Sequence, residues 1–364
     1  MRIAMIVPGP IDRVTGGSIY DRRLKDRLCE KGAQVRIISV PDLAYAASLI
    51  LSPIISLAVA AKLIGRGYDL IIIDAWAHPC LLPIILACRA ARKPRLVLIV
   101  HQLRWVERKT APGARIASAV ERASLRSADL IITVSRFMRA RIESLAVEPS
   151  NVLVAYPGCD GAQAADCETG AEQRAGGLRL LFVGNCTPRK GLEYLIEALS
   201  ILKDPLISLD VVGDCRFDPA YSERLRRDVE AFDLGGAVRF HGRASGGALR
   251  SFYSRADVFV MPSLYEGYGI VYAEAMRAGL PIIATDGGPA SEIVRDGENA
   301  LLVPPADSVS LARAIGRLAR DPELRSRMAC RSLKLACDLP TWQDTCERII
   351  CSIESLLVGC KDRG

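Results

Sequence analysis

The alternation of short apolar runs with longer helix-forming segments predicts an α/β fold in two domains. Runs such as 3–7 and 258–261 have the length of buried strands, and glycine-rich loops separate them from the segments that follow. A repeated order of strand, loop, helix and strand predicts parallel crossovers. The length of 364 residues fits two domains of ordinary size.

The composition provides a large apolar core and argues against a metal site built by the protein. Half of the residues are hydrophobic, and 48 basic against 41 acidic residues give a net charge of +7. The chain has three histidines, no His-Glu-x-x-His and no Asp-x-Asp, which makes a protein-built metal site unexpected. Its twelve cysteines include no Cys-x-x-Cys and lie mostly in apolar runs, so we expect reduced core thiols and a cytoplasmic protein.

The first strand, 2–7, is too short for the core of a signal peptide. A loop with Gly16 and Gly17 follows, then a helix over about 18–31 and a strand at 34–40. The Gly-x-Gly-x-x-Gly pattern of dinucleotide-binding proteins is absent from this first turn, which argues against a hydride-transfer enzyme. The glycine pair suits a ligand-facing loop and a plain flexible loop equally.

Residues 43–61 carry no charge over nineteen positions, close to the length that spans a bilayer. A spanning helix is excluded because strands 34–40 and 69–74 on either side belong to one sheet. Pro53 is expected to kink or break the segment. Small residues at every fourth position predict one closely packed stripe, made of Ala44, Ser48, Ser52, Ser56 and Ala60. Two interpretations stay open: coverage by neighbouring helices, or a face turned to a membrane or a lipid acceptor.

Two histidines follow strands of the first half, His78 after 69–74 and His101 directly after 95–100. Open α/β sheets bind ligands at the carboxyl ends of their strands, so both are site candidates beside the alternative of a structural role. The stretch 89–126 contains ten Lys or Arg against two acids, with Trp105 among them. This local charge of +8 should attract anions, from a phosphorylated acceptor or an anionic membrane.

We divide the chain into a first domain, 1–162, a linker, 163–177, and a second domain, 178–340. The second domain opens with strand 178–183 and a loop in which Arg189 and Lys190 lie beside a helix start. Two adjacent cations at such a place suit phosphate oxygens. The loop is not a Walker A loop, because no Ser or Thr follows Lys190 and Gly191.

The unit 258–285 combines an anion site with two carboxylates. Strand 258–261 leads into a loop with two glycines, a helix over 270–278 and strand 281–285. The first turn of this helix offers free N–H groups to phosphate, while Glu266 and Glu274 can accept hydrogen bonds from hydroxyls. A nucleotide sugar has both features, because its ribose and hexose lie on either side of a diphosphate.

Residues 262–281 follow the frame Pro-Ser-x-x-Glu-Gly-x-Gly-Ile-x-x-x-Glu-Ala-Met-x-x-Gly-x-Pro. This frame resembles the signature of the family 4 (group 1) retaining glycosyltransferases. The resemblance implies the GT-B fold, in which two Rossmann-like domains face a central cleft, with the donor held by the second domain and the acceptor by the first. It also implies a last helix, about 341–364, that crosses back onto the first domain.

The implied reaction moves a hexose from a nucleoside diphosphate sugar to an acceptor hydroxyl, with retention of anomeric configuration and without a metal or other cofactor. The expected partners are a glycan or lipid-linked acceptor and no nucleic acid. The uncharged segment 43–61 and the basic stretch 89–126, rather than the resemblance, lead us to expect reversible docking on the anionic inner face of the cell membrane. The resemblance assigns catalysis to Glu266, His101 and Lys190, and we expect Arg189 to take the place of the family's Arg. It assigns donor binding to Glu274, Gly269, Ile270, Val271, Gly184 and Asn185, and the diphosphate and acceptor loop to Gly16 and Gly17.

Asn185 departs from this family, which has an Arg directly after the glycine that ends the strand. The departure keeps an alternative open: a catalytically weak partner subunit or a sensor that binds nucleotide sugars. A sugar epimerase of the same fold is a further alternative, although the glutamate frame does not support it.

Overall fold

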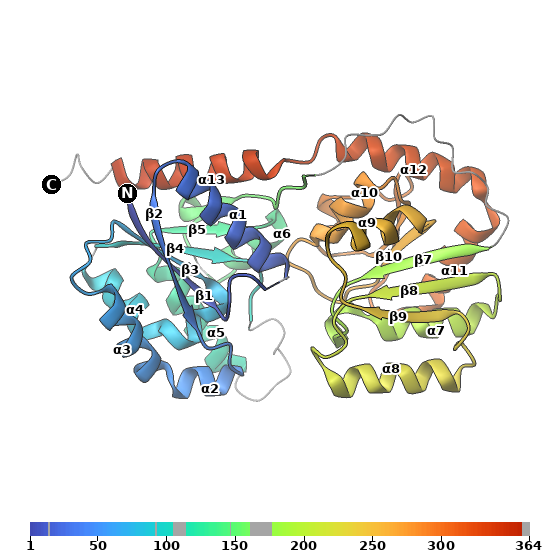
Figure 1. Ribbon diagram of the computed structural model, residues 1–364, viewed down its shortest axis with the longest axis horizontal. Coiled ribbons are helices and arrows are strands. Elements are labelled where there is room, and N and C mark those ends of the chain that lie inside the picture. The colour runs from blue at the N-terminus through green and yellow to red at the C-terminus, as the bar shows by residue number, and fades with distance from the viewer. Residues whose placement is uncertain (14, 92, 105–113, 146, 161–176, 359–364) are drawn as a thin grey trace. The chain divides into compact units, whose positions relative to one another are not determined.

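The computed structural model describes residues 1–13, 15–91, 93–104, 114–145, 147–160 and 177–358. They form two compact units: unit 1 is Met1–Gly158 with Pro340–Gly364, and unit 2 is Cys159–Leu339. Each unit has a six-stranded sheet with helices on both faces (Figure 1). The predicted α/β class is therefore confirmed. Of the predicted linker, only Gly177 is among the described residues.

The sheet of unit 1 is parallel throughout and has the order β2-β1-β3-β4-β5-β6. The chain reverses its direction across the sheet between β1 and β3, and ligands bind at such a switch point in open α/β sheets. The strands are β1 (Arg2–Pro8), β2 (Gln34–Val40), β3 (Leu70–Asp74), β4 (Arg95–Val100), β5 (Leu130–Thr133) and β6 (Val152–Val154).

Helices α1 and α13 lie on one face of this sheet, and α3, α4 and α5 lie on the other (Figure 1). The α-helices are α1 (Gly16–Glu30), α2 (Tyr45–Ile50), α3 (Ser52–Leu63), α4 (His78–Ala91), α5 (Ala114–Ser127), α6 (Arg136–Glu143) and α13 (Trp342–Val358). Short 3-10 turns occupy Ala75–Ala77 and Pro149–Asn151.

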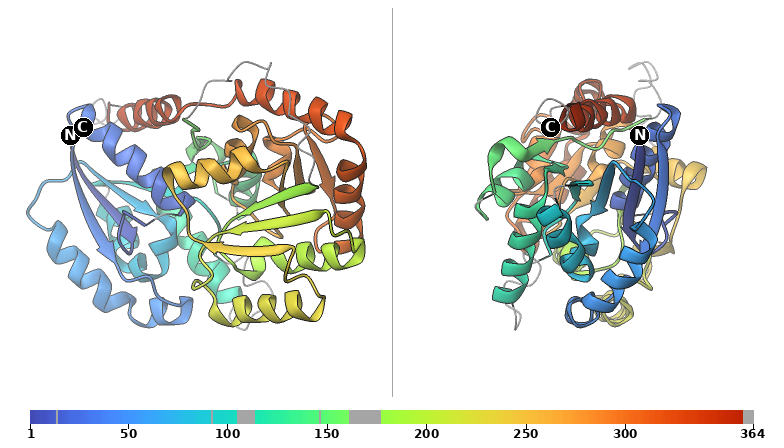
Figure 2. Two further views of the ribbon diagram at one scale, coloured as in Figure 1. Left: turned by 45° about the vertical axis from the view of Figure 1, so that its right-hand side comes forward. Right: turned by 90° about the vertical axis from the view of Figure 1, so that its left-hand side faces the viewer.

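Helix α13 comes from the end of the chain and packs on α1 within unit 1, as both views of Figure 2 also show. The Trp342 ring meets the Tyr20 ring edge-on at 5.7 Å. The Tyr20 hydroxyl donates to the carbonyl of Ala155 at 3.0 Å, and the Thr345 hydroxyl donates to that of Tyr156 at 2.7 Å. The end of the chain thus completes the core of unit 1.

Helix α1 begins earlier than the sequence predicts. The Thr15 side chain accepts a hydrogen bond from the Ser18 amide at 3.2 Å and caps the helix. Gly16 and Gly17 are therefore its first two residues, and the expected glycine loop ahead of a helix at residue 18 is wrong.

The uncharged segment 43–61 forms two helices, α2 and α3, that separate at Leu51. Pro53 lies in the first turn of α3, where its missing N–H has no cost. The predicted stripe of small residues is buried at Ser48, Ser52 and Ser56, and the Ser56 hydroxyl donates to the Cys80 carbonyl at 3.1 Å. The stripe lets α3 pack closely on α4.

The opposite side of α3 is an exposed apolar face. Ile54, Leu57 and Ile64 are 68%, 73% and 76% exposed, and Ile50 on α2 extends the face. Coverage of the whole segment by neighbouring helices of this chain is therefore wrong. Among the described residues no helix is long and apolar enough to cross a bilayer.

The sheet of unit 2 is also parallel and has the order β12-β11-β10-β7-β8-β9. Its switch point lies between β7 and β10, the order found in dinucleotide-binding Rossmann sheets. The strands are β7 (Leu178–Val183), β8 (Ile207–Val212), β9 (Val238–Gly242), β10 (Val258–Met261), β11 (Ile282–Thr285) and β12 (Ala300–Val303).

Helices α7 and α8 cover one face of this sheet and α9, α10 and α12 the other (Figure 1). The α-helices are α7 (Leu192–Leu202), α8 (Pro219–Ala231), α9 (Gly246–Arg255), α10 (Ile270–Arg277), α11 (Ser308–Arg320) and α12 (Pro322–Ala336). Short 3-10 turns occupy Pro188–Lys190 and Pro289–Glu292.

The described cysteines are free thiols, but not all of them belong to the core. Cys80, Cys159, Cys186 and Cys346 are buried as expected. The expectation is wrong for residues on the solvent side or at the ends of helices, namely Cys29, Cys330, Cys337 and Cys351.

Gly158 allows the last helix to join unit 1. A Cβ atom at this position would lie 2.2 Å from the backbone nitrogen of Trp342. We expect Gly158→Ala to lower the free energy of unfolding by about 2 kcal/mol, because the clash involves backbone that must shift. Urea unfolding checks this value. Gly235→Ala is the control, since a Cβ there meets no atom within 4 Å, and equal stability of the two variants would contradict the prediction.

Candidate active site

The loops after β7 and β10 meet at the switch point of unit 2. The amide of Leu264 donates to the carbonyl of Arg189 at 2.8 Å. Gly191 has a left-handed φ of 67°, and a Cβ atom there would lie 2.1 Å from the carbonyl oxygen of Pro262. Glycine is therefore required for the two loops to approach each other.

This approach creates an ion cluster that we call the Glu266 cluster, made of Arg189, Lys190, Ser263 and Glu266. The Lys190 Nζ donates to Glu266 Oε1 at 2.5 Å, and the Arg189 Nη1 donates to Glu266 Oε2 at 3.2 Å. The Ser263 hydroxyl donates to Oε1 at 2.9 Å. Glu266 is 8% exposed, so these three contacts replace nearly all of its hydration.

The Glu266 cluster is ionic despite its burial. Burial raises the pKa of Glu266, but the charges of Lys190 and Arg189 outweigh it and lower that pKa to about 2. Burial also lowers the pKa of Lys190, although Glu266 acts against this change. Since the folded pKa of Glu266 is depressed, the stabilisation exists above its unfolded pKa and is lost as the pH falls toward 2.

Helix α10 begins beside this cluster. Its cap, Gly269, has a left-handed φ of 93°, and a Cβ there would lie 2.6 Å from the ring of Tyr272. The Tyr272 hydroxyl donates to the Met261 carbonyl at 3.2 Å, which fixes the ring under the turn. The amides of Ile270 and Val271 fall in the first turn, where a helix offers N–H groups to an anion.

Glu274 lies one turn further along α10 and is half-buried. Tyr253, a residue that the sequence did not single out, donates its hydroxyl to Glu274 Oε2 at 2.7 Å. Burial raises the pKa of Glu274, and the Tyr253 bond opposes this rise. In the protein without a ligand, the Glu274 carboxylate therefore accepts a hydrogen bond from the Tyr253 hydroxyl.

Asn185 joins two loops of unit 2. Its side-chain oxygen accepts a hydrogen bond from the Asp214 amide, after β8, at 3.4 Å. The backbones of the two loops also approach each other closely at Gly184 and Gly213. A Cβ atom at Gly213 would lie 1.8 Å from the Gly184 carbonyl oxygen. The stem of Lys190 lies 3.4 Å from the position of a Cβ at Gly184. Asn185 thus holds the loop that presents Lys190, whereas the family has a cation at this position.

In unit 1, His101 lies at the carboxyl end of β4 and contacts the start of α1. Its Nε2 is 3.1 Å from Asp21 Oδ1, and its ring meets the Tyr20 ring edge-on at 5.2 Å. A Cβ at Gly17 would lie 3.0 Å from the imidazole. The structure therefore brings two predicted residues, Gly17 and His101, together.

Two carboxylates beside His101 were not predicted. Asp21 and Asp74 are 1% and 6% exposed, and ligand-type atoms of Asp21, Asp74 and His101 lie within 4.8 Å of one another. The Nε2 atom of His101 faces the Asp21 carboxylate, an arrangement in which the ring donates its N–H to the carboxylate. A signal was available: Asp74 ends an otherwise apolar strand, and the neighbouring strand is followed directly by His101.

The two groups have shifted pKa values. Burial and then the charge of Asp21 raise the pKa of Asp74 to about 7. Burial lowers the pKa of His101, but Asp21 and Asp74 together raise it above its ordinary value. His78 differs, because it is buried, its Nδ1 bonds the Ala75 carbonyl at 2.6 Å, and burial lowers its pKa to about 3. His78 therefore has the structural role.

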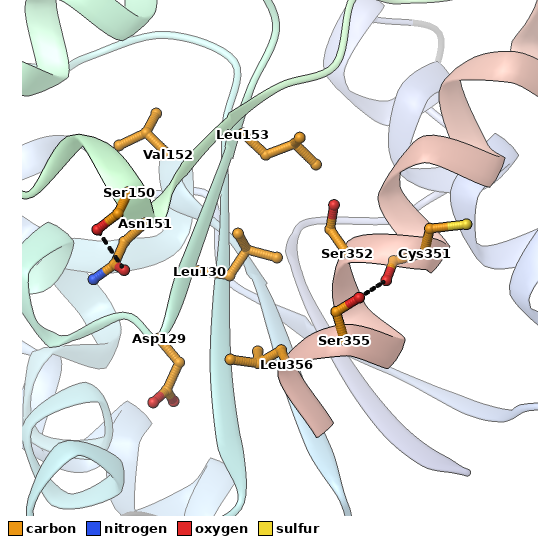
Figure 3. Close-up of a pocket in the computed structure, with 10 residues that line it drawn as sticks. All are labelled: Asp129, Leu130, Ser150, Asn151, Val152, Leu153, Cys351, Ser352, Ser355 and Leu356. Atoms are coloured by element: carbon orange, nitrogen blue, oxygen red, sulfur yellow. Dashed lines mark hydrogen bonds between the residues drawn. The ribbon is translucent and has the colours of Figure 1, made fainter. Parts of the chain in front are cut away.

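A pocket of about 420 Å³ in unit 1 lies away from these groups (Figure 3). It is bordered by Asp129 and Leu130 at the start of β5, by Val152 at the start of β6, and by Ser352 and Ser355 of α13. It thus lies at the amino ends of the strands, whereas α/β sheets bind ligands at the carboxyl ends. The Glu266 cluster and the His101 group remain the site candidates.

The chain is similar in sequence to bacterial glycosyltransferases. It is 33% identical to the alpha-D-kanosaminyltransferase of Streptomyces kanamyceticus over 254 residues, which cover 64% of each chain. It is 28% identical to the D-inositol 3-phosphate glycosyltransferase of Thermomonospora curvata over 253 residues, which cover 64% of this chain and 57% of that protein. The chain thus spans less than two thirds of the length of these relatives.

Solved structures match almost the whole chain. Sucrose-phosphate synthase from Thermosynechococcus elongatus superposes with a TM-score of 0.83 at 25% identity, covering 99% of this chain and all of that one. HepE from Anabaena, in complex with UDP-glucose, superposes with a TM-score of 0.75 at 20% identity, covering 97% and 99%. These likenesses confirm the predicted GT-B fold.

Two family models match consecutive parts of the sequence. The Glycosyl transferase 4-like domain matches residues 13–158, and Glycosyl transferases group 1 matches residues 172–334. Between them they span most of the chain, including both site candidates. The chain belongs to the group 1 glycosyltransferases.

Proposed function

We propose that this chain is a glycosyltransferase that moves a hexose from a nucleoside diphosphate sugar to an acceptor hydroxyl with retention of anomeric configuration. The Glu266 cluster carries this proposal, because two cations, a carboxylate and a helix start converge at the switch point of unit 2. HepE has the same fold and was solved with UDP-glucose, which makes UDP-glucose the first donor to test.

The donor's diphosphate would lie between the first turn of α10 and the side chains of Arg189 and Lys190. Helix amides and cations both favour phosphate oxygens. Glu274 would accept the ribose hydroxyls in place of the hydroxyl of Tyr253, which it binds in the free protein. Exchanging one hydroxyl for another needs little rearrangement, so this step should cost little free energy.

Catalysis would come from charge that develops as the sugar leaves the diphosphate. Breaking the bond from the anomeric carbon to the diphosphate oxygen adds negative charge there, and Arg189 and Lys190 lie where they can stabilise it. Glu266 would bind hydroxyls of the sugar as positive charge develops on the ring. Because two cations are already present for the leaving group, we propose that no metal ion is required.

Asn185 supports a second candidate, a catalytically weak subunit or a nucleotide-sugar sensor. Its amide side chain is uncharged and accepts a hydrogen bond from the Asp214 backbone, and this position therefore offers no positive charge to a diphosphate. Slow hydrolysis of the donor separates the two candidates, since a sensor binds the nucleotide sugar but does not turn it over.

We further propose that the exposed apolar face of α2 and α3 docks on the cytoplasmic surface of a membrane, where a lipid-linked acceptor would be available. Exposed cations lie near these helices: Lys62 is near the end of α3 and Arg66 follows α3. Arg89 is near the end of α4, the helix on which α3 packs. Anionic headgroups attract such residues by about 1 kcal/mol each, and the apolar side chains add burial. Trp105 and part of the basic stretch 89–126 lie outside the described residues.

Lys190→Ala should lower the turnover of UDP-glucose about a hundredfold, or roughly 3 kcal/mol in activation free energy, because a charge-assisted contact to the leaving group is lost. Arg189 and Ser263 still bind Glu266 in the variant, so it should fold with reduced stability. Release of UDP is measured beside Lys334→Ala, an exposed lysine of α12, as a control for charge. Normal turnover of Lys190→Ala would overturn its assignment.

Glu274→Ala and Glu266→Ala should fail in different ways. Ribose contacts exist in the ground state and in the transition state, so Glu274→Ala should weaken the binding of UDP measured by calorimetry. Glu266→Ala should chiefly lower kcat, because its contact strengthens as the sugar becomes cationic. Equal loss of UDP affinity in both variants with kcat unchanged would contradict the separate roles.

The membrane proposal predicts co-sedimentation of the chain with anionic vesicles at low salt and its release at high salt. Ile54→Glu should abolish sedimentation, because it places a charge on the apolar face. Leu206→Glu is the matched control, since Leu206 is an equally exposed apolar residue in unit 2. A wild-type chain that stays in the supernatant at low salt would overturn the proposal.

A further inference from the structure

We propose that Asp21 and Asp74 form a buried acid pair that orients His101 and keeps its imidazole protonated. Both carboxylates are thus positioning residues that act through His101. The inference rests on the proposed function and on the resemblance that has His101 face the reacting sugar, and it adds the groups that set the charge and the direction of the His101 ring.

The geometry places the imidazole between two elements. Asp21 on α1 accepts the Nε2–H of His101 at 3.1 Å, and Gly17 one turn earlier leaves room for the ring. Asp74 ends β3, the strand next to β4 in the sheet, and belongs to the same cluster of atoms within 4.8 Å. The ring is held by a hydrogen bond, by the edge contact with Tyr20 and by the helix backbone.

The net charge of the buried group explains why Asp21, Asp74 and His101 together retain protons. Two buried carboxylates cannot both be ionised beside a neutral ring without leaving uncompensated charge in a poorly solvated place. One proton between the carboxylates and one on the imidazole give a neutral group. Among the described residues, the ionisable groups that face the ring are Asp21 and Tyr20 from α1 and Asp74 from β3.

The protonation of His101 decides what its other nitrogen can do. The bond to Asp21 uses Nε2, so Nδ1 is the ring atom left for a ligand. In a neutral ring with Nε2–H, Nδ1 only accepts a hydrogen bond, whereas in an imidazolium it donates one. The His101 side chain is partly exposed, and a donor suits a hydroxyl oxygen of a sugar.

The pKa shifts agree with this arrangement. Burial and Asp21 raise the pKa of Asp74 to about 7, so Asp74 stays protonated in mildly acidic solution. The two acids together raise the pKa of His101 although burial lowers it. When Asp74 ionises at higher pH, it adds negative charge beside the ring and prolongs its protonation. Activity should therefore decline only as the pH rises through the raised pKa of His101.

The test is an NMR titration of the histidine rings of the full chain, which has three histidines. His101→Gln assigns the resonance. We expect a midpoint above 6.5 for His101, lowered by about one unit or more in Asp21→Asn. In Asp74→Asn the fall should be smaller, because Asn resembles the protonated acid. Asp26→Asn, an exposed residue of the same helix, should leave the midpoint unchanged.

This titration needs no turnover, so its outcome is separate from that of the proposed function. An unchanged midpoint in Asp21→Asn would overturn the acid pair. Where Asp21→Asn does not fold, Asp21→Glu replaces it: the retained carboxylate should keep the midpoint raised, and a midpoint at or below 6.5 would overturn the inference.

Kinetics then tests the link to catalysis. At a pH well above the midpoints of both the wild type and the variant, a shift of one unit reduces the protonated fraction of His101 about tenfold, and kcat of Asp21→Asn should fall by the same factor. The KM for the donor should not change. Because Asp21 acts through His101, the double variant with His101→Gln should be no slower than His101→Gln alone. A further tenfold loss in the double variant would show that Asp21 acts independently.

Discussion

The burial of the Glu266 carboxylate is the constraint on which the candidate site of unit 2 depends. A carboxylate without water must be compensated, and Lys190 and Arg189 provide that compensation from a loop 76 and 77 residues away. They reach it only because the sheet order places β7 beside β10 and because Gly191 lets the two loops touch. The ion pairs of Glu266 therefore require both the order of the strands and the close approach of the two loops.

Much of this site could be predicted from local patterns. The glutamate frame at 262–281 and the cations at 189 and 190 follow from spacing, and apolar runs identify the strands. The pairing of Glu266 with both cations could not be predicted, because sequence distance carries no information on contact between two loops. The hydrogen bond between Asn185 and the loop after β8 could not be predicted for the same reason. The start of α1 was misjudged because glycine pairs suggest loops, whereas the Thr15 cap determines the boundary.

Unit 1 shows a different limit of sequence analysis. An uncharged helix has the same composition whether it is covered or exposed, so residues 43–61 allowed two interpretations until burial was known. Ile54 and Leu57 are exposed while Ser52 and Ser56 are buried, the reverse of what polarity alone would suggest. Small size rather than hydrophobicity decides which side of α3 packs on α4. Asp74 could have been noticed as the polar end of an apolar strand, whereas the contact of Asp21 with His101 is recognised only when α1 is placed beside β4.

Under the proposed function, the Glu266 carboxylate competes with the phosphates of the donor for the two cations with which it is paired. A ligand must interact with the cations more favourably than this carboxylate does. The carboxylate has the advantage of a high effective concentration, because it is part of the same chain. Inorganic phosphate and nucleoside monophosphates, which are abundant in cells, make fewer contacts than a diphosphate with a ribose and a hexose attached. Under the proposed function, the Glu266 carboxylate would therefore disfavour the binding of the most common small anions relative to a nucleoside diphosphate sugar.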